Sequence, residues 1–125
     1  MIFDTDIFIW IQRGNPKAAR LVERESERFV SVQSYLELLQ DAENKQQHEY
    51  TKQFIRDVGF RTLPLSGNIG HRATVYMELY SLSHGLRAGD ALIAATAAEH
   101  NLVLCSSNAK HFKPIKDLKL KAFRP

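Results

Sequence analysis

The sequence has few residues that could form disulfide cross-links and no long apolar run that could span a membrane. Among its 125 residues there is one cysteine, Cys105, which excludes an internal disulfide and a zinc cluster built on cysteines. We therefore expect a reducing, cytoplasmic setting. No apolar run reaches the ~18 residues that a membrane-spanning helix needs. The first residues have no basic segment followed by a long apolar stretch, so we expect neither a secretory signal nor a membrane partner.

Glycine and proline are also sparse, at six and four residues, and they mark single turns rather than a flexible linker. No internal repeat or low-complexity stretch interrupts the chain. The composition, 44% hydrophobic and 25% charged, is ordinary for a globular protein. It excludes a wholly disordered chain, a collagen-like repeat and a coiled-coil rod. A chain of this length can bury one hydrophobic core, so we expect a single domain over residues 1–125.

Positive charge is concentrated at the C-terminal end. The net charge is +3 and the isoelectric point is about 9.1, which alone is a weak indication of nucleic-acid binding. Residues 110–125 contain one acid and six basic residues: Lys110, Lys113, Lys116, Lys119, Lys121 and Arg124. This segment is either a solvated tail or a surface for a polyanion, and the sequence favours neither.

Short β-rich runs alternate with longer helical patterns. We expect strands over 1–5, 28–32, 60–65, 102–105 and 118–123, the last at a sheet edge. We expect helices over 7–11, 17–27, 34–40, 46–58, 69–83 and 91–98, with a turn at 106–108. The run 91–98 is apolar almost all round and 102–105 is continuously apolar, as a parallel sheet covered on both faces requires. The prediction is an α/β fold: a three-layer α/β/α sandwich with a mainly parallel sheet of four to five strands.

Four polar residues are predicted to meet at one edge of this sheet, because ligands bind at the carboxyl ends of parallel strands. Asp4 ends the first strand, Glu37 lies in the helix after the second, Asp90 opens the buried helix and Asn108 follows the fourth strand. Neighbouring carboxylates repel one another unless they are protonated or bridged by a cation. Oxygen ligands without histidine or cysteine select Mg²⁺ or Mn²⁺, which can activate water to attack a phosphodiester.

Three of these residues also have a purely structural interpretation. Asp90 stands where an N-cap of the buried helix is expected. Glu37 lies three residues after Ser34, which is the spacing of a capping box. Asn108 is a common turn or cap residue. At this point both interpretations of each residue remain open.

Asp4 is harder to explain structurally, because aspartate is disfavoured in strands. Thr5 and Asp6 can cap the helix that follows without it. We therefore expect Asp4 to be functional and Asp6 to be primarily a helix cap.

Four blocks of residues together carry a family resemblance. They are Asp4-Thr5-Asp6, Ser34-Tyr35-Leu36-Glu37-Leu38, the run from Gly85 to Ala97 (GLRAGDALIAATA) and Ser107-Asn108-Ala109-Lys110-His111-Phe112. With these blocks in this order, the chain resembles a PIN-domain ribonuclease, specifically a VapC-type toxin of a bacterial type II toxin–antitoxin pair. The resemblance covers essentially the whole chain, and the third block is the most specific.

The resemblance implies a Mg²⁺- or Mn²⁺-dependent endoribonuclease whose catalytic and metal-site positions are Asp4, Glu37, Asp90 and Asn108. Ser106, where the family commonly has threonine, supports the site. The family also implies an RNA substrate, a homodimer and inhibition by a cognate antitoxin.

Two residues depart from the family pattern. Asp6 replaces the usual asparagine or serine and adds a carboxylate, which is a further candidate metal ligand. Asp41 stands where glycine commonly follows the glutamate block, so the loop there can differ. Thr5 is expected to support the site. Three cations are expected to hold RNA phosphates: Arg87, Lys110 and Lys113.

Other functions remain open beside the ribonuclease. An Asp-x-Asp phosphohydrolase would use Asp4 as its nucleophile, although Phe8 stands where that class expects threonine or valine. A non-catalytic PIN-like domain that binds RNA or a protein is a further alternative. A receiver-type signalling domain ranks low, because residues 63–67 supply no phosphoacceptor aspartate.

Overall fold

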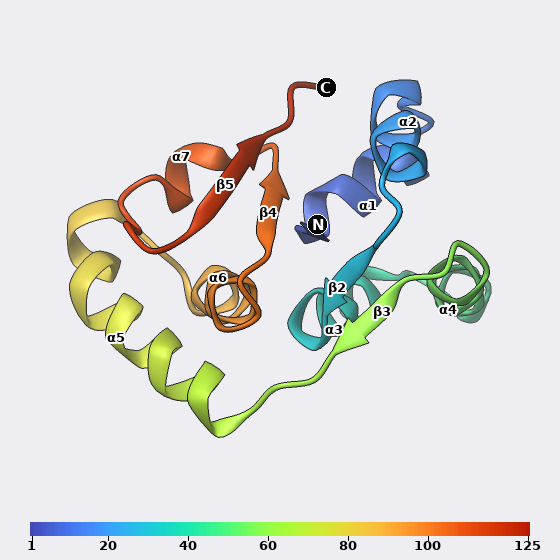
Figure 1. Cartoon of the computed structure of the whole chain (residues 1–125). Helices are drawn as coiled ribbons and strands as arrows, with labels where there is room; N and C mark the ends of the chain where they lie inside the picture. Colours follow the sequence, from blue (N-terminus) through green and yellow to red (C-terminus); the bar gives the residue numbers. More distant parts are fainter.

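The computed structural model describes residues 1–125 as five strands alternating with seven helices (Figure 1). The strands are β1 (Ile2–Phe3), β2 (Phe29–Ser31), β3 (Arg61–Leu63), β4 (Val103–Ser106) and β5 (Lys119–Ala122). The helices are α1 (Thr5–Gln12), α2 (Pro16–Arg24), α3 (Val32–Asp41), α4 (Lys45–Asp57), α5 (Gly67–His84), α6 (Ala88–Glu99) and α7 (Ala109–Phe112). The strand order is β3-β2-β1-β4-β5 and every neighbouring pair is parallel. The predicted α/β/α sandwich is confirmed, with β5 at an edge as expected.

Helices cover both faces of the sheet. Because successive strand residues point to opposite faces, neighbouring residues of one strand enter different cores. Ile2 belongs to the core cluster under α5, α6 and α7, whereas Phe3 belongs to the cluster under α1, α2 and α4. In Figure 1 these two groups of helices lie to the left and to the right of the sheet. The continuous apolar pattern of the strands follows from this double cover.

Helix α6 is the most deeply buried helix. Its alanines Ala91, Ala94, Ala95 and Ala97 are fully buried, and small side chains let the helix approach the sheet closely. Gly85 ends α5 in the left-handed conformation, with φ +67°, which glycine adopts without strain. The predicted C-cap at Gly85 is therefore confirmed, and the tight turn leads directly into α6.

Two predicted caps are wrong. The N-cap of α3 is Ser31, whose hydroxyl accepts the Ser34 amide at 3.0 Å, so Ser34 lies inside the helix and the capping box with Glu37 does not form. Both serines fit the cap pattern, and the end of β2 decides between them. At α1 the cap is Asp4, which accepts the Thr5 amide at 2.8 Å, and Asp6 is in the first turn.

Several predicted boundaries shift, and one helix was missed. The second helix ends at Arg24 rather than 27, and β1 and β3 are shorter than expected. The short helix α7 follows the predicted turn, with Phe112 only 1% exposed. Its four residues are too few to show a helical period in the sequence. None of the seven helices combines the length and the hydrophobicity that a membrane-spanning segment needs.

Candidate functional site

The site begins where β1 and β4 end side by side. These strands are parallel neighbours, so Asp4 and Ser106 reach the same edge of the sheet. The Asp4 carboxylate is only 5% exposed and both of its oxygens accept hydrogen bonds. Oδ1 accepts the Thr5 amide at 2.8 Å, and Oδ2 accepts the Ser106 hydroxyl at 2.7 Å. Asp4 therefore caps α1 and is fixed in orientation by Ser106, whose supporting role in the site stays a prediction.

Asp6 ties α1 to the turn after β4. Its Oδ2 accepts the Ser107 amide at 3.0 Å, the Ser107 hydroxyl through a short contact, and the Ser106 hydroxyl at 3.5 Å. Its other oxygen, Oδ1, is buried and has no hydrogen-bond partner. A buried carboxylate oxygen without a partner is costly, and it requires an explanation such as a bound ion or water.

Glu37 approaches the same edge from α3. The Thr5 hydroxyl donates to Glu37 Oε1 at 2.5 Å and is hydrogen-bonded to Ser34 Oγ at 2.9 Å. Gln33 Nε2 donates to the other oxygen, Oε2, at 3.3 Å. Thr5 thus links the first turn of α1 to the glutamate, and its role in the site stays a prediction.

The glutamate also lies against the start of α6. A Cβ added at Gly89 would lie 2.5 Å from Glu37 Oε2. A larger residue at this position, one residue before Asp90, would require the Glu37 carboxylate to shift. Asp90 itself is partly buried, and no side chain caps α6, so the simple N-cap interpretation of Asp90 is wrong.

The electrostatics connect the four acids. The pKa of Asp4 is raised from 3.8 to about 7, chiefly by burial, then by the charge of the neighbouring Asp6 and to a smaller extent by Asp90. Burial also raises the pKa of Asp90; the His111 side chain lowers it and Glu37 raises it. Each carboxylate therefore stands in the field of others, which is the situation that a bridging cation relieves.

Asn108 lies at the rim of the site. Its backbone amide donates to the Ser106 hydroxyl at 2.9 Å, and this hydroxyl in turn donates to the Asp4 carboxylate. The residue occupies the N-cap position of α7, but its side chain makes no capping hydrogen bond. The exposed side-chain carboxamide of Asn108 therefore does not cap the helix, which was the structural interpretation of this residue.

The three predicted phosphate-binding cations are exposed and take part in no ion pair. Arg87 precedes α6, and its charge lowers the pKa of Asp90, so it lies on the site side of the molecule. Lys110 and Lys113 belong to or follow α7. The binding of phosphate by these three cations stays a prediction.

Two residues with no role predicted from the sequence, Trp10 and Ser107, are joined to the site by hydrogen bonds. Ser107 holds Asp6, and Trp10 Nε1 donates to the Ser107 hydroxyl at 3.3 Å. The only signal in the sequence was the helical spacing of Asp6 and Trp10, four residues apart on one side of α1.

The donor set suits a hard divalent cation. The chain alone forms no group of three or more histidine, cysteine, aspartate or glutamate residues arranged to hold a metal ion. The site is therefore not a preformed cage. The unpartnered Asp6 oxygen, the raised pKa of Asp4 and the all-oxygen chemistry nevertheless fit Mg²⁺ or Mn²⁺. Mg²⁺ commonly uses only one or two carboxylates and keeps several waters.

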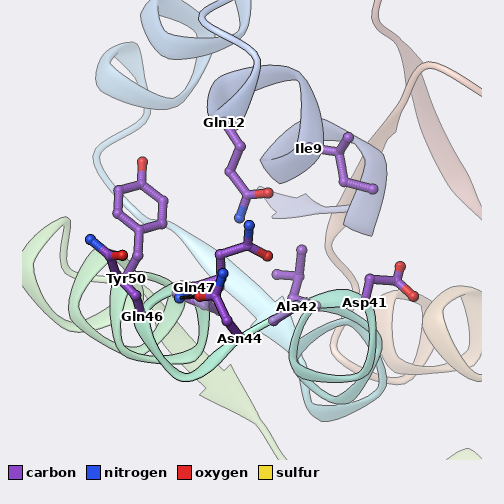
Figure 2. Close-up of a pocket in the computed structure, with 10 residues that line it drawn as sticks. Ile9, Gln12, Asp41, Ala42, Asn44, Gln46, Gln47 and Tyr50 are labelled. Carbon is purple, nitrogen blue, oxygen red and sulfur yellow. Dashed lines mark hydrogen bonds between the residues drawn. The ribbon is translucent and has the colours of Figure 1, made fainter.

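A hollow of about 470 Å³ lies beside α1 and is lined by none of the four acids (Figure 2). It lies between α1, α3 and α4, and it is lined by Ile9, Gln12, Leu38, Asp41, Ala42, Asn44, Gln46, Gln47, Tyr50 and Thr51. Leu38 and Asp41 follow Glu37 along α3, so the hollow leads away from the acids. Asp41 is its one charged residue.

Known proteins share both the sequence pattern and the fold. Residues 1–118 match the model of the PIN domain family. Curated proteins gave no match. A chain of a toxin–antitoxin complex from Klebsiella pneumoniae is 26% identical, with a TM-score of 0.78 over 94% of this chain and 93% of that one. A chain of VapBC-1 from nontypeable Haemophilus influenzae is 25% identical, with a TM-score of 0.77 over 98% of each chain.

A third structure is similar in fold at lower identity. A chain of VapBC2 from Rickettsia felis, solved with a DNA fragment from its promoter, is 20% identical, with a TM-score of 0.78 over 99% of this chain and 100% of that one. These similarities confirm the predicted resemblance to VapC-type toxins. The family match spans nearly the whole sequence, and the chain therefore belongs to the PIN domain family.

Proposed function

We propose that this chain is a divalent-metal-dependent endoribonuclease and the toxin of a toxin–antitoxin pair. Membership of the PIN domain family and similarity to toxin–antitoxin complexes support a toxin nuclease. The observation that carries the finer proposal is the convergence of Asp4, Asp6, Glu37 and Asp90 at one edge of the sheet. One carboxylate oxygen there is buried without a partner, and the pKa of Asp4 is raised to about 7.

In this proposal Asp4, Glu37, Asp90 and Asn108 hold Mg²⁺ or Mn²⁺, directly or through water, and Asp6 adds a further oxygen. When bound, such an ion lowers the pKa of a water and stabilises the charge on the departing oxygen of the phosphodiester.

The protein's own contribution is to orient the carboxylates of the site. Ser106 and the Thr5 amide fix both oxygens of Asp4, and the Thr5 hydroxyl fixes Glu37, so the acids need little rearrangement. In this proposal Arg87, whose charge lowers the pKa of Asp90, pairs with a phosphate of the substrate.

RNA is the proposed substrate because of the charge on the C-terminal segment. Its exposed lysines, among them Lys110 and Lys113, offer phosphate contacts near the turn that carries Asn108. A single-stranded or looped region is the expected form, because its bases are accessible. We also propose a cognate antitoxin that covers the site and a homodimeric assembly, as the toxin–antitoxin similarity suggests.

Cleavage of a mixed cellular RNA pool by purified protein, free of antitoxin, tests this function. It is run with Mn²⁺ and with EDTA, using wild type, Asp4→Asn and the matched control Asp57→Asn, whose side chain on α4 is 71% exposed. We expect discrete cuts that need both the metal and Asp4 and that Asp57→Asn leaves unchanged. Cutting that persists in EDTA or in Asp4→Asn contradicts the proposal. Burst release from a small phosphate ester without RNA cleavage would favour the phosphohydrolase instead.

A further inference from the structure

One side of helix α1 carries a row of residues that leads away from the candidate active site. Asp6, Trp10 and Arg13 recur at spacings of four and three, which places them on one side of the helix. The Trp10 indole N–H donates to Ser107 Oγ at 3.3 Å, and the Ser107 hydroxyl donates to Asp6. The Arg13 guanidinium lies over the Trp10 ring, 5.7 Å from its centroid. An acid, an aromatic ring and a cation thus follow one another outward from the site.

We propose that Trp10 and Arg13 form a nucleotide-binding subsite beside the candidate active site, where a base of single-stranded RNA stacks on the indole and a flanking phosphate pairs with Arg13. The substrate class rests on the proposed function. Stacking on an aromatic ring with an arginine nearby is a general way to bind single strands, because every base offers a π-face.

The indole is held in a fixed place rather than free to rotate. Its hydrogen bond to Ser107 joins α1 to the turn after β4, and Ser107 is itself bound to Asp6 through its amide at 3.0 Å. Two hydrogen bonds therefore separate the ring from an acid of the site. Because the ring is partly exposed and anchored by its edge, a base can contact it with little loss of side-chain entropy.

Charge favours this side of α1 over the hollow on the other side. Arg13 is exposed and makes no ion pair, so its charge is available to a phosphate. The hollow beyond Ile9 and Gln12 has no cation among its lining residues and one acid, Asp41. The first surface therefore offers a phosphate a cation that the lining of the hollow lacks.

The test measures RNA binding rather than cleavage, in EDTA, with a labelled single-stranded oligoribonucleotide of mixed sequence. Trp10 is the only tryptophan of the chain, so its emission reports stacking directly. We expect single-stranded RNA to quench this emission to saturation and duplex RNA to leave it nearly unchanged. Fluorescence anisotropy should show that Trp10→Ala raises the Kd about ten-fold, within the range expected for the loss of one base–aromatic stack.

Variants separate stacking from a structural role. Trp10→Phe keeps a ring and should restore the Kd to within about three-fold of wild type. Arg13→Gln should weaken binding and reduce the slope of log K against log salt by about 0.7, the value for one phosphate contact on a single strand. Tyr50→Ala, which removes a 47% exposed ring from the hollow, is the matched control and should bind as wild type. Circular dichroism confirms that each variant is folded.

Three outcomes overturn the subsite. They are an unchanged Kd in folded Trp10→Ala, a loss of affinity in Tyr50→Ala equal to that in Trp10→Ala, and a tryptophan emission that saturating single-stranded RNA leaves unchanged. The proposed function fails separately, because it depends on cleavage with Mn²⁺. Wild type that cuts RNA while Trp10→Ala binds normally refutes the subsite alone.

Discussion

Replacing Asp4 with asparagine should stabilise the metal-free protein at pH 8, although it removes a residue of the proposed active site. The folded protein raises the pKa of Asp4 from 3.8 to about 7, chiefly by burial and then by the charge of Asp6. A carboxyl group with a higher pKa in the folded state loses stability as the pH rises from the unfolded pKa to the folded one. Its penalty is complete above pH 7.

The size of the effect follows from the shift. At about 1.4 kcal/mol per pH unit, ionisation of Asp4 costs the folded state about 4 kcal/mol at pH 8 and about 2 kcal/mol at pH 5. Asparagine does not ionise, so its folded state does not carry this cost. Its carboxamide, however, accepts only one of the two hydrogen bonds from the Thr5 amide and Ser106. That mismatch costs about 1–3 kcal/mol. We therefore expect Asp4→Asn to gain about 1–3 kcal/mol at pH 8 and to gain nothing at pH 5.

Urea denaturation in EDTA at both pH values measures this prediction. The change in the free energy of unfolding caused by the substitution should be about 2–3 kcal/mol more favourable at pH 8 than at pH 5, because the hydrogen-bond cost is the same at both. Asp57→Asn on the exposed face of α4 should show no such dependence. An Asp4→Asn effect that is equal at the two pH values would refute the reasoning.

Three further predictions concern the metal, the glutamate and the fold. Saturating Mn²⁺ should raise the free energy of unfolding of wild type by about 2.7 kcal/mol at 100 times its Kd, and calorimetry should show a smaller gain in Asp4→Asn. Gly89→Ala should lower the RNA cleavage rate at least about ten-fold without lowering the melting temperature, because its Cβ displaces Glu37 while alanine favours the helix; an unchanged rate contradicts the placement of Glu37. Arg72→Leu should cost about 1 kcal/mol in urea denaturation, since Arg72 pairs with two acids and is about one-third exposed.

The sequence predicted the layered fold because its strands and buried helix are strongly patterned. The apolar runs 91–98 and 102–105 correspond to α6 and β4, and Gly85 ends α5 as expected. The positions of Asp4, Glu37 and Asp90 at one edge also followed, because the topology of a parallel sheet brings strand ends together. The individual roles of these residues stay predictions until the chemistry is measured.

What the sequence could not supply depends on contacts between distant segments. Ser31 and Ser34 both fit a helix cap, and only the end of β2 selects Ser31. The partners of Asp6 are Ser106 and Ser107, about one hundred positions away along the chain, so its role as a tie between α1 and the β4 turn has no local signal.

The position of a bound Mn²⁺ ion tests the central claim most directly. Crystals grown or soaked with Mn²⁺ would be measured at a wavelength where manganese scatters anomalously. The account predicts an anomalous peak at the carboxyl edge of β1 and β4, about 2.0–2.4 Å from oxygens of Asp4 or Asp90, or linked to them through ordered waters. Saturating Mn²⁺ with no peak at this edge, or with peaks only elsewhere, would contradict it.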